Sequence, residues 1–275
     1  MADAGSASGR KRLGVVGWPV AHSRSPAFQN AALRAAGLTE WRYQLLPVPP
    51  ERFDETVRAL PQAGFRGVNV TIPHKASALA LAERPTPRAA AIGAANTLLF
   101  DPDGSIAADN TDAPALIAAL PRSAAGATAL VLGAGGSARA AVWALLDGGA
   151  AEIRVWNRSR ERAAALCREL GGTPVTRSAP ADLLVHCTAL GLGAGHQDLD
   201  GLPIGPDDVC DYAVVVDFVY REGGTALVNA ARERSVETVD GLELLVGQGA
   251  LSFEQFTGLA APVEAMREAV GLSAS

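Results

Sequence analysis

A glycine-rich turn between an apolar run and a helical segment is the feature that most constrains the fold. Residues 129–132 are a strong strand candidate. Gly133-Ala134-Gly135-Gly136-Ser137-Ala138 follows, and residues 140–146 form the next predicted helix. This G-x-G-x-x-A spacing is typical of dinucleotide-binding βαβ units, although glycine-rich turns also occur in other βα units. Gly133 permits the tight turn, Gly135 lets the backbone approach a pyrophosphate, and Ala138 allows close packing of helix and strand. We predict that this turn and the helix N-terminus bind a diphosphate.

Short apolar runs alternate with helical segments along the chain, which predicts an α/β fold with a mostly parallel sheet. In the first half we expect strands at residues 13–17, 43–48, 67–72 and 97–100, and helices at 26–36, 51–60 and 75–82. A second series of strands begins at Ala129, after a stretch rich in small residues, and continues at 153–156, 183–187 and 214–218. The length of 275 residues is enough for about two domains.

Charge and cysteine content exclude several classes of function. The net charge of −5 provides no basic field for nucleic acid or anionic lipid. Three cysteines, Cys167, Cys187 and Cys210, are an odd number without metal-ligand spacing, and they indicate reduced thiols in a cytoplasmic protein. The apolar stretch at 13–21 superficially resembles a signal peptide, but its glycines and proline favour a strand and turn. We expect no transmembrane helix.

Arginines follow the second strand of the predicted nucleotide unit, where NAD-dependent enzymes place an acidic residue. The segment from Arg154 to Arg162 contains four arginines. Guanidinium groups bind phosphate in a bidentate manner, and Asn157 and Ser159 can add hydrogen bonds, so the segment favours the 2′-phosphate of NADP. Arg158 and Arg162 are the preferred candidates. A solvated helix start is the alternative, and it suits Arg160.

The first half of the chain contains three groups of polar residues, each flanked by apolar residues in the sequence. The two-residue period of a strand puts Asn69 and Thr71 on one face, with Lys75 just beyond the strand end. Asn96 precedes another strand, and the cluster Asp109-Asn110-Thr111-Asp112 precedes a predicted helix at 114–120. Asn110 or Asp112 could simply cap that helix.

Ordered motifs along nearly the whole chain from Leu13 identify a family resemblance. They are Ser23-Arg24-Ser25-Pro26, Asn69-Val-Thr71-Ile-Pro73-His-Lys75, Ala95-Asn96-Thr97, Asp109-Asn-Thr-Asp112, Gly133-Ala-Gly-Gly136, Asn157-Arg-Ser159, Asp217-Phe-Val-Tyr220 and Asp240-Gly241. In this order the motifs resemble shikimate dehydrogenase. The resemblance implies an α/β substrate-binding domain at 11–112, completed by a helical segment at 248–275. A Rossmann-type NADP-binding domain at 113–247 follows, with a cleft between the two, and residues 1–10 form a disordered tail.

The resemblance also implies the roles of individual residues. Lys75 and Asp112 would be the catalytic pair, and Ser23 and Ser25 would bind the substrate carboxylate. The ring and its hydroxyls would contact Asn69, Thr71, Asn96, Tyr220 and Gln248. The cofactor would bind Gly133, Ala134, Gly135, Gly136, Ser137, Ala138, Asn157, Arg158, Ser159, Arg162, Thr188 and Gly241.

The residue types agree with this chemistry. Hydroxyls and helix N–H groups can hold a carboxylate, although Ser25 could instead be a plain N-cap. An ammonium such as that of Lys75 can give a proton to a developing alkoxide and stabilise its charge, so no metal is implied.

The expected function is the reversible, NADPH-dependent reduction of 3-dehydroshikimate to shikimate in aromatic amino-acid biosynthesis, by a monomer or homodimer. The alternatives are a quinate/shikimate dehydrogenase and a non-catalytic NADPH-binding regulator. Ser25 and Arg158 count against the first alternative, and Lys75 with Asp112 against the second. His186-Cys187 stands where many relatives have Asn-Ala, and Glu222 where they often have proline. We predict that His186 is a packed residue or part of the cleft wall rather than a catalyst.

Overall fold

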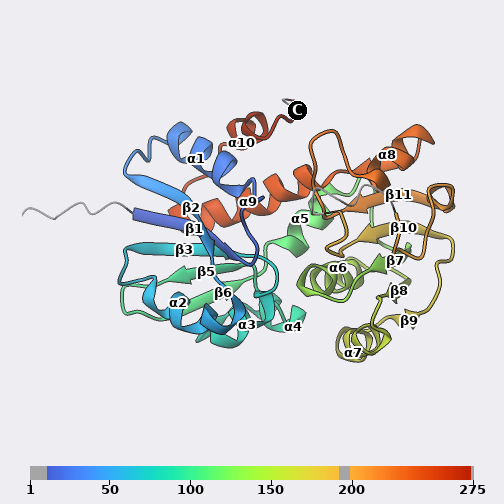
Figure 1. Ribbon diagram of the computed structural model, residues 1–275, viewed down its shortest axis with the longest axis horizontal. Coiled ribbons are helices and arrows are strands. Elements are labelled where there is room, and N and C mark those ends of the chain that lie inside the picture. Colours follow the sequence, from blue (N-terminus) through green and yellow to red (C-terminus); the bar gives the residue numbers. More distant parts are fainter. Residues whose placement is uncertain (1–10, 192–198, 274–275) are drawn as a thin grey trace, which may run out of the picture.

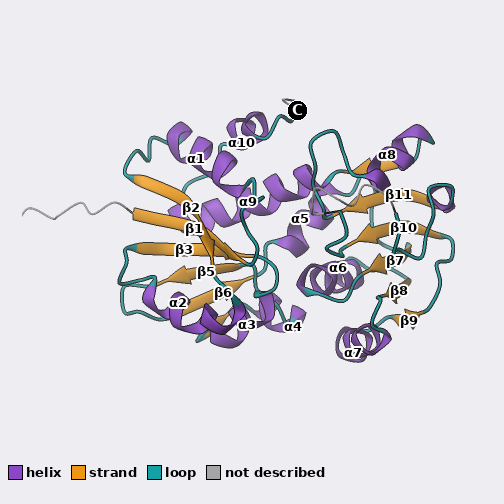
Figure 2. Ribbon diagram, viewed as in Figure 1, coloured by secondary structure: helices purple, strands orange, loops and turns teal. Residues whose placement is uncertain are grey.

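The computed structural model describes residues 11–191 and 199–273, so the predicted tail at 1–10 lies outside the described residues. Two six-stranded sheets form in this part of the chain, and they lie side by side with helices over their faces (Figures 1 and 2). Residues 11–109 contribute the strands of the first sheet, and residues 128–239 those of the second. The predicted α/β class is confirmed.

The first sheet has the strand order β2-β1-β3-β5-β6-β4. Its strands are β1 (Lys11–Gly17), β2 (Trp41–Pro47), β3 (Phe65–Val70), β4 (Arg84–Pro85), β5 (Thr97–Phe100) and β6 (Ile106–Asp109). Strand β1 pairs in parallel with β2 and β3, but β5 runs antiparallel to both β3 and β6. A tight turn from Asp101 to Ser105 joins β5 to β6, and so short a link permits only antiparallel pairing. The sheet is therefore mixed, whereas the alternating pattern predicted mostly parallel strands.

Helices cover both faces of this sheet, as in a three-layer α/β unit. They are α1 (Ser25–Ala35), α2 (Phe53–Ala59) after the 3₁₀ turn η1 (Pro50–Arg52), α3 (Lys75–Leu81) and α4 (Pro87–Ile92). Phe53 and Val57 of α2 pack with Val68 and Val70 of β3 on one face. On the other face, Phe28 of α1 packs with the C-terminal helices. The three helices predicted here are confirmed within a residue or two at each end, whereas α4 was not predicted.

The second sheet is parallel throughout its described strands, in the order β12-β11-β10-β7-β8-β9. Its strands are β7 (Thr128–Leu132), β8 (Glu152–Trp156), β9 (Thr173–Val175), β10 (Ala181–His186), β11 (Tyr212–Asp217) and β12 (Glu237–Val239). The flanking helices are α6 (Gly136–Asp147), α7 (Arg160–Leu170) and α8 (Ala226–Glu233), with η2 (Asp208–Asp211) before β11. The strand order reverses between β7 and β10, and doubly wound sheets bind ligands at such a switch point.

Two helices connect the halves of the molecule. Helix α5 (Asp112–Ala119) packs against α9 (Gly241–Thr257), and both lie between the sheets in Figure 1. Helix α9 then contacts β3 and β5 of the first sheet, and α10 (Val263–Ala269) packs on α1. The domain boundary predicted at 247/248 thus falls inside one continuous helix. The division into domains stays a prediction.

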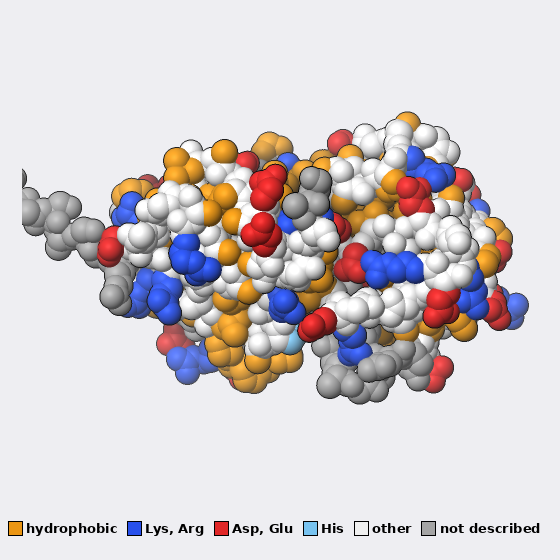
Figure 3. Space-filling model, turned by 90° about the horizontal axis from the view of Figure 1, so that it is seen from above, with side chains coloured by type: hydrophobic (Ala, Val, Ile, Leu, Met, Phe, Trp, Pro, Cys, Tyr) orange, Lys and Arg blue, Asp and Glu red, His pale blue; other side chains and the backbone are white. Residues whose placement is uncertain are grey.

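Membrane and nucleic-acid contacts were both predicted to be absent. Within residues 11–191 and 199–273, no helix is both long and apolar enough to cross a membrane. Basic and acidic side chains are interspersed over the described part of the face in Figure 3.

Asp109 at the end of β6 connects the sheet to two helices. Its carboxylate accepts hydrogen bonds from Thr86 and Arg88 at the start of α4 and from Gln255 of α9. Burial alone would raise the pKa of Asp109. The hydrogen bonds from Thr86, Arg88 and the Asn110 backbone outweigh burial and lower this pKa below its ordinary value. Ionised Asp109 therefore stabilises the fold at neutral pH.

Replacing Asp109 by asparagine should lower the free energy of unfolding at neutral pH by about 1.5–3 kcal/mol, because charged hydrogen bonds are lost. Since the folded-state pKa is lowered, this contribution is present above the ordinary aspartate pKa and disappears as pH falls through the folded value. Urea unfolding of both proteins at neutral pH and at a pH well below the ordinary aspartate value of about 3.9 measures the difference. An equal difference at both pH values would contradict a stabilising role for the ionised form.

Candidate functional site

A cleft of about 390 Å³ lies between the two halves of the molecule. Both halves line it, and its wall includes every residue predicted for catalysis or substrate binding, together with two predicted cofactor residues. These are Ser23, Ser25, Asn69, Thr71, Lys75, Asn96, Asp112, Thr188, Tyr220, Gly241 and Gln248. The structure thus brings together residues that are more than 200 positions apart in the sequence.

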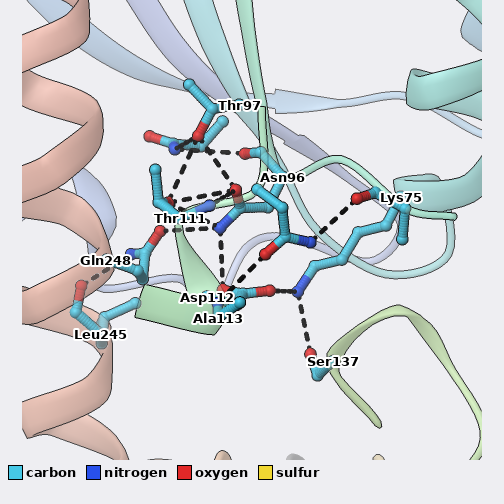
Figure 4. A network of polar contacts seen from close by, with 12 residues as sticks. Lys75, Asn96, Thr97, Thr111, Asp112, Ala113, Ser137, Leu245 and Gln248 are labelled. Carbon is cyan, nitrogen blue, oxygen red and sulfur yellow. Dashed lines mark hydrogen bonds and ion pairs between the residues drawn. The ribbon is translucent and has the colours of Figure 1, made fainter. Parts of the chain in front are cut away.

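Two oxygen atoms hold the Lys75 side chain in the wall of this cleft. Lys75 is the first residue of α3, and its side chain is buried apart from 11% of its surface. Its Nζ donates to Asp112 Oδ2 at 2.6 Å and to Ser137 Oγ at 2.9 Å (Figure 4). An ammonium has three protons, so one remains for a group in the cleft.

Asp112 opens α5 but does not cap it. The Asn110 side chain accepts from the Ala113 N–H at 3.2 Å, so the capping alternative applies to Asn110. The Asp112 carboxylate instead accepts from Lys75 on one oxygen and from Asn96 Nδ2, at 2.8 Å, on the other. Both carboxylate oxygens therefore have a donor.

Asn96 joins this ion pair to α9. Its Nδ2 also lies 3.0 Å from Thr111 Oγ1 and 3.4 Å from Gln248 Oε1, and its Oδ1 accepts from the Thr111 N–H at 2.8 Å (Figure 4). Thr111 was not singled out as a site residue, although it belongs to the polar cluster noted in the sequence. The amide of Asn96 is consequently fixed from both sides.

The side chain of Asn69 is fixed by its neighbours in the same way. Its Oδ1 accepts from the Tyr43 hydroxyl at 2.8 Å and from Ser252 at 3.4 Å. Burial raises the pKa of Tyr43 well above its ordinary value, against a hydrogen bond with Ser25, so this phenol is a neutral donor. Sequence reasoning missed Tyr43 and Ser252, because a tyrosine in a strand and a serine in a helix carry no signal of their own.

Hydroxyl groups gather at the start of α1. The Ser25 N–H donates to Ser23 Oγ at 3.3 Å, and the Ser25 side chain makes no helix-capping bond, so the N-cap alternative for Ser25 is wrong. Tyr220 lies beside them, since burial raises its pKa while hydrogen bonds with Ser23 and the Arg24 backbone oppose the rise. The hydroxyls of Ser23, Ser25 and Tyr220 can therefore bind the same group of a ligand.

The glycine-rich turn has the predicted strand–turn–helix context. Gly133 adopts a φ of +121°, and a Cβ there would lie 3.0 Å from the backbone of Cys187. At Gly136 a Cβ would lie 2.8 Å from the Lys75 side chain. Helix α6 begins at Gly136, four residues earlier than predicted, so its N-terminus contacts Lys75 directly. Any larger residue at position 136 would collide with Lys75, so this position needs glycine.

The arginine segment begins within β8, which pairs with β7, and ends in the first turn of α7. Arg154 forms an ion pair with Glu152 of the same strand, and its Nε lies 2.7 Å from Glu152 Oε1. Ser159 caps α7 by accepting from the Arg162 N–H and donates to Glu161, and Asn157 donates to the Ser159 carbonyl. Arg158 and Arg162 are exposed. Among the described residues, no hydrogen bond or ion pair engages either guanidinium, so both can bind an external anion.

These features fit NADP at the second sheet. The open backbone at Gly135, where a Cβ would meet nothing within 4 Å, and the N-terminus of α6 suit a diphosphate. Arg158 and Arg162 suit a further phosphate. In the described ranges, no three His, Cys, Asp or Glu side chains gather as metal ligands would.

Comparison with known proteins identifies a family. Residues 15–98 match the shikimate dehydrogenase substrate binding domain, 116–189 match shikimate/quinate 5-dehydrogenase, and 241–270 match the shikimate 5′-dehydrogenase C-terminal domain. A shikimate dehydrogenase (NADP(+)) of Methylobacterium radiotolerans is 46% identical over 263 residues, covering 90% of this chain and 91% of the relative. One from Anaeromyxobacter dehalogenans is 45% identical over 279 residues, covering 96% and 97%.

A solved structure has the same arrangement. Shikimate 5-dehydrogenase from Thermus thermophilus, in complex with NADP(H) and shikimate, matches with a TM-score of 0.82 and 38% identity, over 94% of this chain and 97% of that chain. Because relatives above 30% identity cover nearly the full length, the resemblance read from the motifs is confirmed. The chain belongs to the shikimate dehydrogenase family.

Proposed function

We propose that the cleft carries out the reaction of this family, the reversible NADPH-dependent reduction of 3-dehydroshikimate to shikimate, with Lys75 and Asp112 as the catalytic pair. The observation that carries this assignment is the Lys75 ammonium, which has two fixed partners and a third proton available to the cleft. The close relatives carry the name shikimate dehydrogenase (NADP(+)), which supports this reaction over the quinate and regulator alternatives.

The substrate binds through its carboxylate and ring hydroxyls. Ser23 and Ser25 lie at the start of α1, where their hydroxyls and the free helix N–H groups can share one carboxylate. Asn69, Thr71, Asn96, Tyr220 and Gln248 surround the remaining space and offer donors and acceptors to the ring hydroxyls. Neighbouring residues hold the amides of Asn69, Asn96 and Gln248, so the binding geometry is set before the substrate arrives.

The ketone is reduced at the Lys75 end of the cleft. Bound NADPH supplies the hydride. Lys75 gives the proton to the developing alkoxide and stabilises its negative charge, while Asp112 and Ser137 hold the ammonium in place. In the reverse direction the neutral amine accepts the proton from the shikimate hydroxyl.

The cofactor binds along the second sheet. Gly133, Ala134, Gly135, Gly136, Ser137 and Ala138 would hold the diphosphate, and Arg158 and Arg162 would hold the 2′-phosphate with Asn157 and Ser159 beside them. Thr188 and Gly241 would bind the nicotinamide end. A cytoplasmic location and a monomeric or homodimeric state belong to the same proposal.

Replacing Lys75 by methionine should lower kcat by about 10²–10⁴ with a modest change in KM, because proton donation is lost in the transition state. Asp112→Asn should also be damaging, and the double variant should be far less than additive, since the two residues share one task. Lys11→Met is the matched control, because Lys11 lies over the Trp41 ring outside the site. Steady-state kinetics and melting curves test this. A lower melting temperature with near-normal kcat per folded molecule would indicate a purely structural pair.

Arg158→Ala should lower kcat/KM for NADPH by roughly 10–150-fold, the worth of a charged phosphate contact, and leave kcat/KM for NADH unchanged. Arg160→Ala is the control in the same segment, and it should affect neither cofactor. Comparable values of kcat/KM for NADH and NADPH in the unmodified protein would overturn the assignment of the 2′-phosphate site.

Ser23→Ala and Ser25→Ala should each raise KM for shikimate by roughly 5–10-fold with little change in kcat, because a carboxylate is bound equally in the ground and transition states. Initial rates over a range of shikimate concentrations measure this. Unchanged kinetic constants in both variants would place the carboxylate elsewhere.

A further inference from the structure

A buried histidine–aspartate pair lies beside the cleft and has no part in the proposed proton transfer. His186 ends β10 and Asp217 ends the neighbouring β11, in register with it. His186 Nδ1 lies 2.8 Å from Asp217 Oδ1, with side-chain exposures of 4% and 0%. The prediction that His186 is a packed residue is confirmed.

Asp217 is satisfied on both of its oxygens. The Val219 N–H donates to Oδ1 at 2.8 Å, and Thr225 Oγ1 donates to Oδ2 at 2.6 Å. A buried carboxylate of this kind only accepts, so His186 must carry its proton on Nδ1. In the neutral ring, Nε2 is then an acceptor.

The free nitrogen of His186 orients a residue of the cleft wall. Nε2 lies 2.6 Å from Thr188 Oγ1, and the Leu190 N–H donates to the same oxygen at 3.1 Å. The Thr188 proton thus points at the histidine, and one lone pair is used by Leu190. Because Thr188 lines the cleft, the lone pair that neither partner uses is what this side chain can offer to a bound group.

We propose that His186 is a positioning residue, which fixes the Thr188 hydroxyl as a hydrogen-bond acceptor for the carboxamide N–H of the nicotinamide. The inference rests on the proposed placement of NADPH in the cleft. Asp217 sets the tautomer of His186, and its bond to the Val219 N–H also holds the segment at 218–220, which lines the same cleft. His186 and Asp217 therefore link the ends of β10 and β11 next to the proposed cofactor site.

Two substitutions separate the two nitrogen atoms of His186. An asparagine amide reaches the position of Nδ1, so His186→Asn keeps a donor for Asp217 and loses the acceptor for Thr188. A glutamine amide reaches the position of Nε2, so His186→Gln keeps the acceptor for Thr188 and leaves Asp217 with one donor fewer. Thr225→Val is the matched control, because it also removes a donor from Asp217 but does not touch Thr188.

The experiment measures the NADPH dissociation constant by fluorescence titration, KM for NADPH and for shikimate, and the melting temperature. His186→Asn should raise both NADPH constants by roughly 5–10-fold, the worth of one hydrogen bond, with KM for shikimate within about twofold. His186→Gln and Thr225→Val should lower the melting temperature and leave the NADPH constants near those of the unmodified protein. Thr188→Val should reproduce the effect of His186→Asn, and the double variant should add nothing further.

Unchanged NADPH constants in His186→Asn, with Thr188→Val still impaired, would overturn the role of His186 alone. If Thr188→Val also left NADPH binding unchanged, the proposed position of the nicotinamide would be wrong, and this inference would fail with it. If the NADPH constants changed in parallel with the melting temperature across all variants, including Thr225→Val, His186 would be a structural residue only.

Discussion

A lysine ammonium and an aspartate carboxylate meet at 2.6 Å, in a place where about nine-tenths of each side chain is hidden from water. Burying two charges costs free energy unless every remaining proton and lone pair finds a partner. Ser137 provides one partner for Lys75, and Asn96 provides one for Asp112. Among the described residues, one ammonium proton of Lys75 has no partner, and Lys75 lines the cleft. The fold therefore leaves this unmet hydrogen bond where a substrate oxygen can accept it.

The same pair connects the two halves of the molecule. Lys75 begins a helix of the first half, whereas Ser137 lies in the first turn of α6, directly after the glycine-rich turn of the second half. Gly136 allows this contact, because a side chain there would collide with Lys75. Gln248 of α9 reaches the network from a third direction through Asn96. A change in the glycine-rich turn would therefore alter the surroundings of the Lys75 ammonium directly.

Local patterns predicted much of the fold and the identity of the site. Apolar runs located the main parallel strands, and the spacing of Gly133 and Gly135 located the nucleotide-binding unit. Strand β5 was predicted at residues 97–100, but its antiparallel direction was not, because the direction depends on a short turn rather than on the residues of the strand. Tyr43 and Ser252 support Asn69 from distant elements, and only tertiary contacts reveal them. The same holds for Arg154, which the sequence grouped with phosphate-binding arginines but which pairs with Glu152.

Chemical rescue tests the central claim, that the Lys75 ammonium delivers the proton, most directly. In a Lys75→Ala variant, added methylammonium should enter the cleft and restore a rate that rises with its concentration and saturates, whereas tetramethylammonium, which has no proton to give, should restore none. Substituted primary ammonium ions should differ in rate according to their acidity. A variant that binds NADPH and shikimate with the affinity of the unmodified protein, yet responds to no primary ammonium ion, would contradict the account.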